Sequence, residues 1–304
     1  MKSVISISLG SSSRDAVTEE NFDGEVIRIE RRGTDGDKEK ARELFATYDG
    51  KADAIGLGGT DLYIFAGGKR YTFRESAKLI ENVKTTPVLD GSGLKNSLER
   101  IVIANLEKNG IINFYGKKVL LVCGVDRFGM AEALTEAGAQ VTFGDLIFGL
   151  GINLPIKSLK VLAWIASVVA PVITKMPVSW FYPVGKEQTQ RLERYPEYFI
   201  ENDIIAGDFH FIRKFMPEQM AGKTIITNTV TKEDRALLKK AGVHCLITTT
   251  PNFNGRSFGT NVLEAALVAL AGRSGPLSAK EYEELLKKHN IQPGIEYFSV
   301  KGSV

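Results

Sequence analysis

The order of apolar and polar residues along the chain changes repeatedly between two patterns, one typical of strands and one typical of helices. Short apolar or alternating runs that end in polar or glycine-rich loops predict strands over 4–9, 25–29, 52–57, 118–123, 140–143, 204–206, 224–227 and 243–248, and a hairpin over 62–65 and 70–73. Apolar residues at helical spacing predict helices over 37–48, 74–82, 94–108, 262–270 and 280–288, and one more that opens at residue 130. Strands that alternate with helices indicate an α/β protein with a doubly wound parallel sheet.

A polar, glycine-bearing stretch over 110–117 predicts a domain boundary, because it stands directly before the most apolar strand. We therefore expect a smaller N-terminal α/β domain over 1–110 and a Rossmann-like nucleotide-binding domain over 111–275. A charged amphipathic helix within 276–304 is expected to pack back on the N-terminal domain.

The loop after the 118–123 strand has the features of a dinucleotide-binding fingerprint. A continuous apolar run, KVLLVC, is typical of a central strand buried on both faces, and it enters a Gly-x4-Gly loop that opens a helix. Glycines allow the tight turn and the close packing of helix on strand, and the amides of the helix N-terminus attract a pyrophosphate. The predicted contacts are Gly124, Val125, Asp126, Arg127, Phe128 and Gly129.

The next strand supports the choice of cofactor. Asp145 follows that strand, about 20 residues after the loop, where an acidic residue accepts a hydrogen bond from the ribose 2′-hydroxyl. Since a carboxylate repels a 2′-phosphate, we expect NAD rather than NADP. Asp126 departs from the fingerprint, because it replaces the glycine at which backbone and phosphate approach most closely. The alternative is a glycine turn in a Rossmann-like sheet that has lost its cofactor.

Polar residues also follow the later strands, where open α/β sheets bind ligands. The residues expected to add cofactor contacts are Gly207, Asp208, Asn228, Thr229 and Thr248. His210 lies in the same region and is a candidate general acid or base, because an imidazole changes its charge near neutral pH. A hydrogen-bonded loop histidine is the alternative.

The segment Pro87-Val88-Leu89-Asp90-Gly91-Ser92-Gly93, with Ser11-Ser12-Ser13 near the first strand, resembles the shikimate/quinate dehydrogenase family. The resemblance implies a substrate-binding first domain, a Rossmann second domain, and a role for Asp90 in binding substrate hydroxyls and pairing with a catalytic lysine. The lysine motif of the family, Asn-Val-Thr-x-Pro-x-Lys, is absent. Lys69, in the predicted hairpin, is the candidate that remains, with a solvated turn lysine as the alternative.

A second resemblance concerns the reaction. Residues 54–59, AIGLGG, together with the glycine loop that follows Asp90, look like the catalytic domain of acyl-carrier-protein reductases, which attack a thioester with a cysteine. Cys123 and Cys245 both lie inside apolar runs, so we expect buried structural cysteines, whereas a reactive thiolate needs an open, electropositive site.

Residues 146–185 form an apolar insertion after the second Rossmann strand, uncharged from 161 to 174 and ending near Trp180-Phe181-Tyr182-Pro183. The uncharged stretch is shorter than the roughly 20 residues of a membrane-spanning helix and contains Pro171, so no transmembrane segment is expected. The alternatives are the interface of a homodimer, a lid or tunnel for an apolar substrate, shallow membrane association, or internal core.

Composition excludes several other classes of protein. The chain has 304 residues, 43% of them hydrophobic, and 39 basic against 36 acidic side chains give a net charge of +3 without a basic patch for nucleic acid. Two cysteines exclude a disulfide framework, three scattered histidines predict no metal site, and no signal peptide is recognisable, so we expect a cytoplasmic protein.

The leading hypothesis is therefore an NAD(P)-dependent oxidoreductase that moves hydride between nicotinamide and a hydroxyl or carbonyl carbon in the cleft between the domains. Asp90 would orient a small-molecule substrate, and Lys69 or His210 would relay the proton. Two alternatives stay open: a reductase of an acyl or other lipid-like carbonyl substrate, and a non-catalytic Rossmann-like ligand-binding protein.

Overall fold

The computed structural model describes residues 1–66, 69–177, 192–253, 256–257 and 259–298, and the chain forms two compact units. The first unit comprises Met1–Ser97, Ala166–Gln188 and Gly259–Ile291, and the second comprises Leu98–Ile165, Thr189–Phe258 and Gln292–Val304. Each unit is built on its own mostly parallel sheet, which confirms the predicted α/β, Rossmann-like fold class.

The first unit contains a five-stranded sheet in the order β2-β3-β1-β4-β7, in which only β2 is antiparallel to its neighbour. Its strands are β1 (Lys2–Ser8), β2 (Ala16–Phe22), β3 (Glu25–Gly33), β4 (Ala54–Gly58) and β7 (Val88–Leu89), with a separate hairpin of β5 (Tyr63–Ala66) and β6 (Lys69–Thr72). Its helices are η1 (Ser12–Arg14), α1 (Lys38–Tyr48), α2 (Arg74–Leu79), α9 (Thr260–Ala271) and α10 (Ala279–Lys288).

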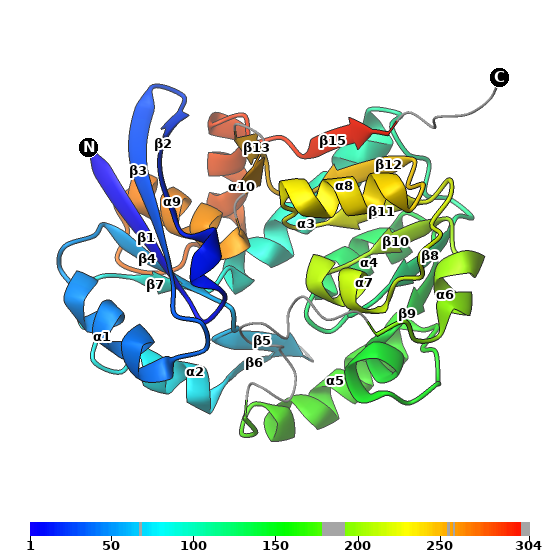
Figure 1. The fold of residues 1–304 in the computed structure, drawn as a ribbon, viewed down its shortest axis with the longest axis horizontal. Coiled ribbons are helices and arrows are strands. Elements are labelled where there is room, and N and C mark those ends of the chain that lie inside the picture. Colours follow the sequence, from blue (N-terminus) through cyan, green and yellow to red (C-terminus); the bar gives the residue numbers. More distant parts are fainter. Residues whose placement is uncertain (67–68, 178–191, 254–255, 258, 299–304) are drawn as a thin grey trace. The chain divides into compact units, whose positions relative to one another are not determined.

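The two faces of β1 and β4 differ in side-chain size, and this difference determines what packs on each. Ile55 and Leu57 belong to the same hydrophobic cluster as Phe45 of α1. On the opposite face, Gly56 lies against α9, where a Cβ at that position would come within 3.0 Å of Asn261 Nδ2. Gly56 and Gly58 of the AIGLGG segment therefore allow a helix of the protein itself to approach the sheet (Figure 1).

The second unit contains a six-stranded sheet in the order β15-β12-β11-β10-β8-β9. Its strands are β8 (Lys118–Leu121), β9 (Gln140–Phe143), β10 (Ile204–Ala206), β11 (Thr224–Thr227), β12 (Cys245–Thr248) and β15 (Gly294–Tyr297), with a separate pair of β13 (Asn252–Phe253) and β14 (Arg256–Ser257). Its helices are α4 (Phe128–Glu136), η2 (Asp145–Gly149), α6 (Pro196–Glu201), α7 (Phe209–Phe215) and α8 (Lys232–Lys240). Two helices run from one unit into the other, α3 (Ser92–Lys108) and α5 (Leu159–Ile173).

The five parallel strands of the second sheet follow the order second, first, third, fourth, fifth along the chain, which is the flavodoxin-like doubly wound arrangement (Figure 1). β9 is added on one side of β8, and β10 and the strands after it are added on the other side, so the topological switch point lies between β8 and β10. β15 adds an antiparallel edge strand beside β12.

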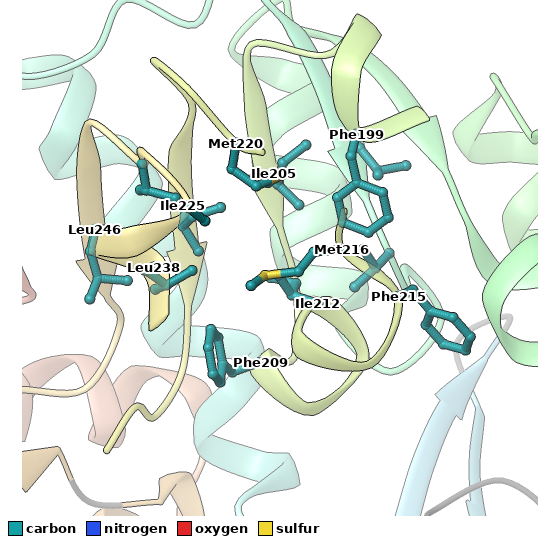
Figure 2. Close-up of a cluster of buried hydrophobic side chains, with 14 of the residues drawn as sticks. Phe199, Ile205, Phe209, Ile212, Phe215, Met216, Met220, Ile225, Leu238 and Leu246 are labelled. Carbon is teal, nitrogen blue, oxygen red and sulfur yellow. The ribbon is translucent and has the colours of Figure 1, made fainter. Parts of the chain in front are cut away.

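The core of the second unit follows from the strand register. Leu120, Ile205, Ile225 and Leu246 are successive partners across four strands, so they point to one face of the sheet and form a continuous apolar row. Aromatic and sulfur-containing side chains of α6, α7 and the residues after it cover that row; Figure 2 labels Phe199, Phe209, Phe215, Met216 and Met220.

Several elements of the structure were not predicted from the apolar pattern, among them two edge strands and a helix in the insertion. β2 and β15 are edge strands with exposed or polar side chains at most positions, so they lack the apolar run of a buried strand. Much of the apolar insertion is α5, a helix that contains Pro171 close to its C-terminal end. Residues 178–185 of the insertion lie outside the described residues. Within the described part of the chain, we find no helix with both the length and the apolar character needed to cross a membrane.

Candidate functional site

The switch point of the second unit lies beside the predicted glycine loop. β8 ends at Leu121 and leads into residues 122–127, and β10 ends at Ala206 and leads into Gly207 and Asp208. The two strands are direct neighbours, and their carboxyl ends lie at the edge of the sheet where ligands bind in doubly wound folds.

A fully buried guanidinium group joins these two loops. The side chain of Arg127 is 0% exposed; it donates to the Glu99 carboxylate and, through Nη2, to Asp208 Oδ2 at 3.0 Å, and its Nε lies 3.8 Å from Asp126 Oδ2. Burial alone would lower the pKa of Arg127, but the charges of Glu99 and Asp208 outweigh burial and raise it above its usual value. Three carboxylates around one cation leave this cluster acidic, and removal of one partner of such a buried pair typically costs about 3–5 kcal/mol.

Asp208 and Asn228 extend the cluster to two further elements. Asp208 caps α7 by accepting from the His210 amide at 2.8 Å, and its Oδ2 accepts from Asn228 Nδ2 at 2.9 Å. Asn228 in turn accepts from the Phe209 amide. The structure therefore brings together four of the predicted cofactor contacts, Asp126, Arg127, Asp208 and Asn228.

Asp145 lies close to the glycine loop, but its carboxylate binds backbone amides of that loop. Its Oδ2 accepts from the Gly124 amide at 3.0 Å and its Oδ1 from the Val125 amide at 2.8 Å. Burial raises the pKa of Asp145, against the opposite effect of these two amides. Two of the amides predicted to meet a pyrophosphate thus bind a side-chain carboxylate.

The first glycine of the loop is required by contacts within the protein. A Cβ on Gly124 would lie 2.8 Å from Leu162 Cδ2 and 2.9 Å from Phe143 Cδ1. Leu162, 0% exposed, belongs to the first turns of α5, so the apolar insertion packs directly on the glycine loop. By contrast, the side chain of the N-cap residue Arg127 makes no hydrogen bond to the first turn of α4, which opens at Phe128 and Gly129.

Cys123 stands just before this loop, and its Sγ lies 3.7 Å from Asp145 Oδ1. Burial, and then the charge of Asp145, raise the pKa of Cys123 well above the usual value for a thiol. Burial also raises the pKa of Cys245 to about 11. Neither environment favours a thiolate nucleophile.

The remaining predicted contacts are dispersed around the sheet edge. Thr248 is buried at the end of β12 and donates from Oγ1 to the Thr250 carbonyl at 3.0 Å, while Thr229 is half-buried after β11. Gly207 has a φ of 127° and packs on Val122. His210 is half-buried in the first turn of α7.

In the first unit, Asp90 organises the loops at the carboxyl edge of the sheet. Its Oδ2 accepts from the amides of Leu62 and Tyr63 at 2.6 and 2.9 Å, and its Oδ1 accepts from the amide and hydroxyl of Ser92 at 3.0 and 2.7 Å. Lys69 is exposed on β6. The catalytic roles of Asp90, Lys69 and His210 stay predictions.

A charged pair that sequence reasoning missed lies at the same edge of the first unit. Lys95 Nζ donates to Asp61 Oδ1 at 2.9 Å, and the two side chains are only 13% and 9% exposed. Asp61 comes shortly after β4, and Lys95 lies in the first turn of α3. The sequence signal for this position is an acidic residue in the short loop that follows a buried strand.

A second buried acidic group lies under the loop that follows Asp90. Glu264 of α9, 1% exposed, accepts from the Tyr282 hydroxyl, and a Cβ on Gly93 would collide with it. Burial, and then the charge of Asp90, raise the pKa of Glu264 to about 8; burial, and then Glu264, raise the pKa of Tyr282. Among the described residues, no group of His, Cys, Asp or Glu side chains has the arrangement of a metal site.

Comparison with known proteins identifies the family. Residues 93–298 match the model of a domain of unknown function, DUF8754, and residues 3–90 match that of another, DUF8753. The chain belongs to the DUF8754 family. None of the curated proteins matches it.

Solved structures that resemble this DUF8754 protein do so at low similarity. A galactofuranose-binding protein is 11% identical, with 95% of this chain and 99% of that chain covered and a TM-score of 0.35. The NAD-dependent malic enzyme of Thermotoga maritima is 12% identical (95% and 84% covered, TM-score 0.35), and the L-tryptophan dehydrogenase of Nostoc punctiforme is 11% identical (95% and 80%, TM-score 0.39). At these scores the similarities carry no functional argument.

The boundary between the two matched segments is informative. The DUF8754 match begins at Gly93, so Lys95 and Glu264 belong to it, whereas Asp61 and Asp90 belong to the DUF8753 segment. The Lys95–Asp61 ion pair therefore links the two sequence families inside the first unit.

Proposed function

We propose that this protein binds a nicotinamide dinucleotide on its second unit and is an NAD(P)-dependent oxidoreductase resembling the shikimate/quinate dehydrogenases. The observation that carries the proposal is the position of the glycine loop and of the N-terminal turn of α4 at the switch point between β8 and β10. Doubly wound sheets bind nucleotides at this position, with the phosphate on the helix N-terminus.

The pyrophosphate is proposed to lie on the first-turn amides of α4, at Phe128 and Gly129, because Asp145 already engages the amides of Gly124 and Val125. Arg127 lies beside Asp126 and offsets part of its charge. Asp145 disfavours a 2′-phosphate, so NAD is the preferred cofactor over NADP.

The chemistry proposed is hydride transfer between the nicotinamide and a hydroxyl or carbonyl carbon of a small molecule. This reaction also needs a group that takes up or supplies a proton, and in the first unit we assign this role to Lys95, which Asp61 holds. The roles predicted for Asp90, Lys69 and His210 are part of the same proposal. Asp90 orients the substrate, directly or through its loop. Lys69 and His210 are the alternatives to Lys95 as the group that carries the proton.

Calorimetric titration with NADH and NADPH tests the cofactor. We expect NADH to bind more tightly than NADPH, and Asp126→Asn to tighten NADH binding by about 3- to 10-fold, because a like charge beside the pyrophosphate is removed. Glu136→Gln makes the same charge change at the far, exposed end of α4 and is expected to leave the affinity unchanged. Absence of binding by either nucleotide, in wild type and Asp126→Asn alike, would contradict the proposal.

A second candidate is a ligand-binding protein without catalysis, and one set of contacts favours it. Asp145 occupies two loop amides, Leu162 packs on Gly124, and the carboxylates around Arg127 close the switch point with the protein's own groups. Binding of a nucleotide or metabolite without turnover over a broad panel of alcohols and ketones would favour this candidate. A reductase of acyl substrates is less well supported, because burial raises the pKa of both cysteines.

A further inference from the structure

The helix α5 carries a stripe of large apolar side chains that are exposed to solvent. Val161, Trp164, Val168 and Val172 are 47%, 66%, 55% and 59% exposed, and their spacing of three or four residues places them on one side of the helix. The other side is buried through Leu162, Ala166 and Ala170. We call these four exposed residues the α5 stripe.

The apolar area available here is that of a protein interface. Leu150, Ile152 and Leu154, just before α5 in the chain, are also more than half exposed. With the α5 stripe they expose on the order of 600–700 Å² of apolar side chain per copy, against about 800 Å² per partner in a standard-size interface. Scattered single apolar residues on a surface need no partner, but four exposed apolar side chains in a row along one side of a helix indicate one.

The charge pattern indicates which partner fits. Lys160 is the only charged residue of α5, and it stands beside Val161 at the N-terminal end of the helix. A two-fold axis places the same surface on both sides of an interface, so a surface without charges avoids like-charge repulsion when it meets itself. An interfacial membrane helix, by contrast, has a solvent-facing side rich in lysine and arginine, whereas the second side of α5 is buried in protein.

We propose that the α5 stripe is the interface of a homodimer, in which it packs against the α5 stripe of a second copy. Trp164 is the main contact, because it is the largest and most exposed member and tryptophan is enriched among the residues that dominate binding energy. This proposal is independent of the nucleotide chemistry.

Sedimentation equilibrium of the full chain at micromolar concentrations tests the proposal. The wild-type protein is expected to have twice the mass of one chain. Trp164→Glu and, separately, Val168→Glu are expected to weaken dimerisation by about 100-fold or more, because each places two unpaired carboxylates in the interface. Tyr115→Glu is the matched control: this residue is 80% exposed in the second unit, outside the α5 stripe, and its replacement is expected to leave the dimer intact.

Circular dichroism melting tests whether each variant is folded. Two substitutions are used so that the proposal can still be tested if one variant does not fold. A wild-type monomer at about 50 μM, or folded Trp164→Glu and Val168→Glu variants that remain dimeric, would overturn the proposal. Flotation of a wild-type monomer with phosphatidylserine-containing vesicles, lost in Trp164→Glu, would overturn it in favour of a membrane surface.

Discussion

Glu264 and Arg127 are ionisable residues that are buried in the protein, and each is held by specific partners. Arg127 is balanced by carboxylates, whereas Glu264 has the neutral Tyr282 as its hydrogen-bond partner and the negative Asp90 nearby. A buried carboxyl group next to another acid is stabilised in its protonated form. Glu264 therefore makes the stability of the first unit depend on pH.

For Glu264 the direction of this dependence follows from its folded-state pKa of about 8, which lies above the ordinary value of 4.5. Between these values the folded state binds a proton that the unfolded state has lost, so the free energy of unfolding falls as pH rises, by up to about 1.4 kcal/mol per pH unit. Glu264→Gln does not titrate and retains an acceptor for Tyr282, so its unfolding free energy should fall less between pH 5.5 and 7.5.

Urea unfolding at three pH values measures this difference. Glu284→Gln, an exposed acid of α10, is the control and should follow the wild type. Parallel pH profiles for the wild type and Glu264→Gln would show that the buried carboxyl is not protonated in the folded protein.

At the scale of elements, the packing of α5 on the β8–α4 loop determines the identity of residue 124. Leu162 approaches so closely that only a residue without a side chain fits beneath it. The same glycine was expected to make room for a cofactor. A tight turn and a helix packed on a loop impose the same requirement for a small residue, so the sequence motif does not separate the two causes.

We expect Gly124→Ala to lower the free energy of unfolding by about 1–3 kcal/mol, because the new methyl group overlaps Leu162. Leu162→Ala alone creates a cavity and should cost about 2–5 kcal/mol. In the double variant the alanine at 124 partly fills that cavity, so the two effects should sum to less than their separate values by at least about 1 kcal/mol.

Urea titration of the four proteins measures this coupling. Gly149→Ala, at a position where a Cβ meets nothing within 4 Å, is the control and should change stability little. Additive effects of the substitutions at 124 and 162 would mean that Leu162 does not pack on the loop.

Over the whole molecule, the chain returns to the first unit after completing most of the second. α9 and α10 follow the β12 strand in sequence, yet they belong to the first unit, where α9 covers β1 and β4. The core of the first unit is therefore built from segments that precede and follow the second unit in the chain. The groups proposed for nucleotide binding lie in the second unit, and the lysine proposed for proton transfer lies in the first.

This separation predicts the effect of replacing Lys95. Lys95→Met is expected to bind NADH with unchanged affinity, since the nucleotide contacts are in the second unit, but to lose turnover by about 100-fold or more. Calorimetry and a steady-state assay with the best substrate of an alcohol and ketone panel measure the two quantities. Lys69→Met, which removes an exposed lysine, is the matched comparison, and a loss confined to that variant would assign the proton transfer to Lys69 instead.

The alternation of strands and helices, the buried 118–123 strand and the loop after it could be predicted from the sequence, because local periodicity reports which side chains face a core. Two edge strands could not be predicted: β2 and β15 are recognisable only by the strands they pair with. Asp61 and Lys95 are 34 residues apart, and nothing local to either indicates that they meet.

The amino-acid order was sufficient for the α/β class and for the polar loops at the strand ends, since both arise from short-range spacing. Packing between segments far apart in the chain decided the rest. It determined whether Gly124 faces a ligand or Leu162, and whether Asp145 faces a ribose or the amides of its own loop. It also determined which lysine pairs with Asp61. Such contacts depend on how distant elements approach one another, and a local pattern of residues does not contain that information.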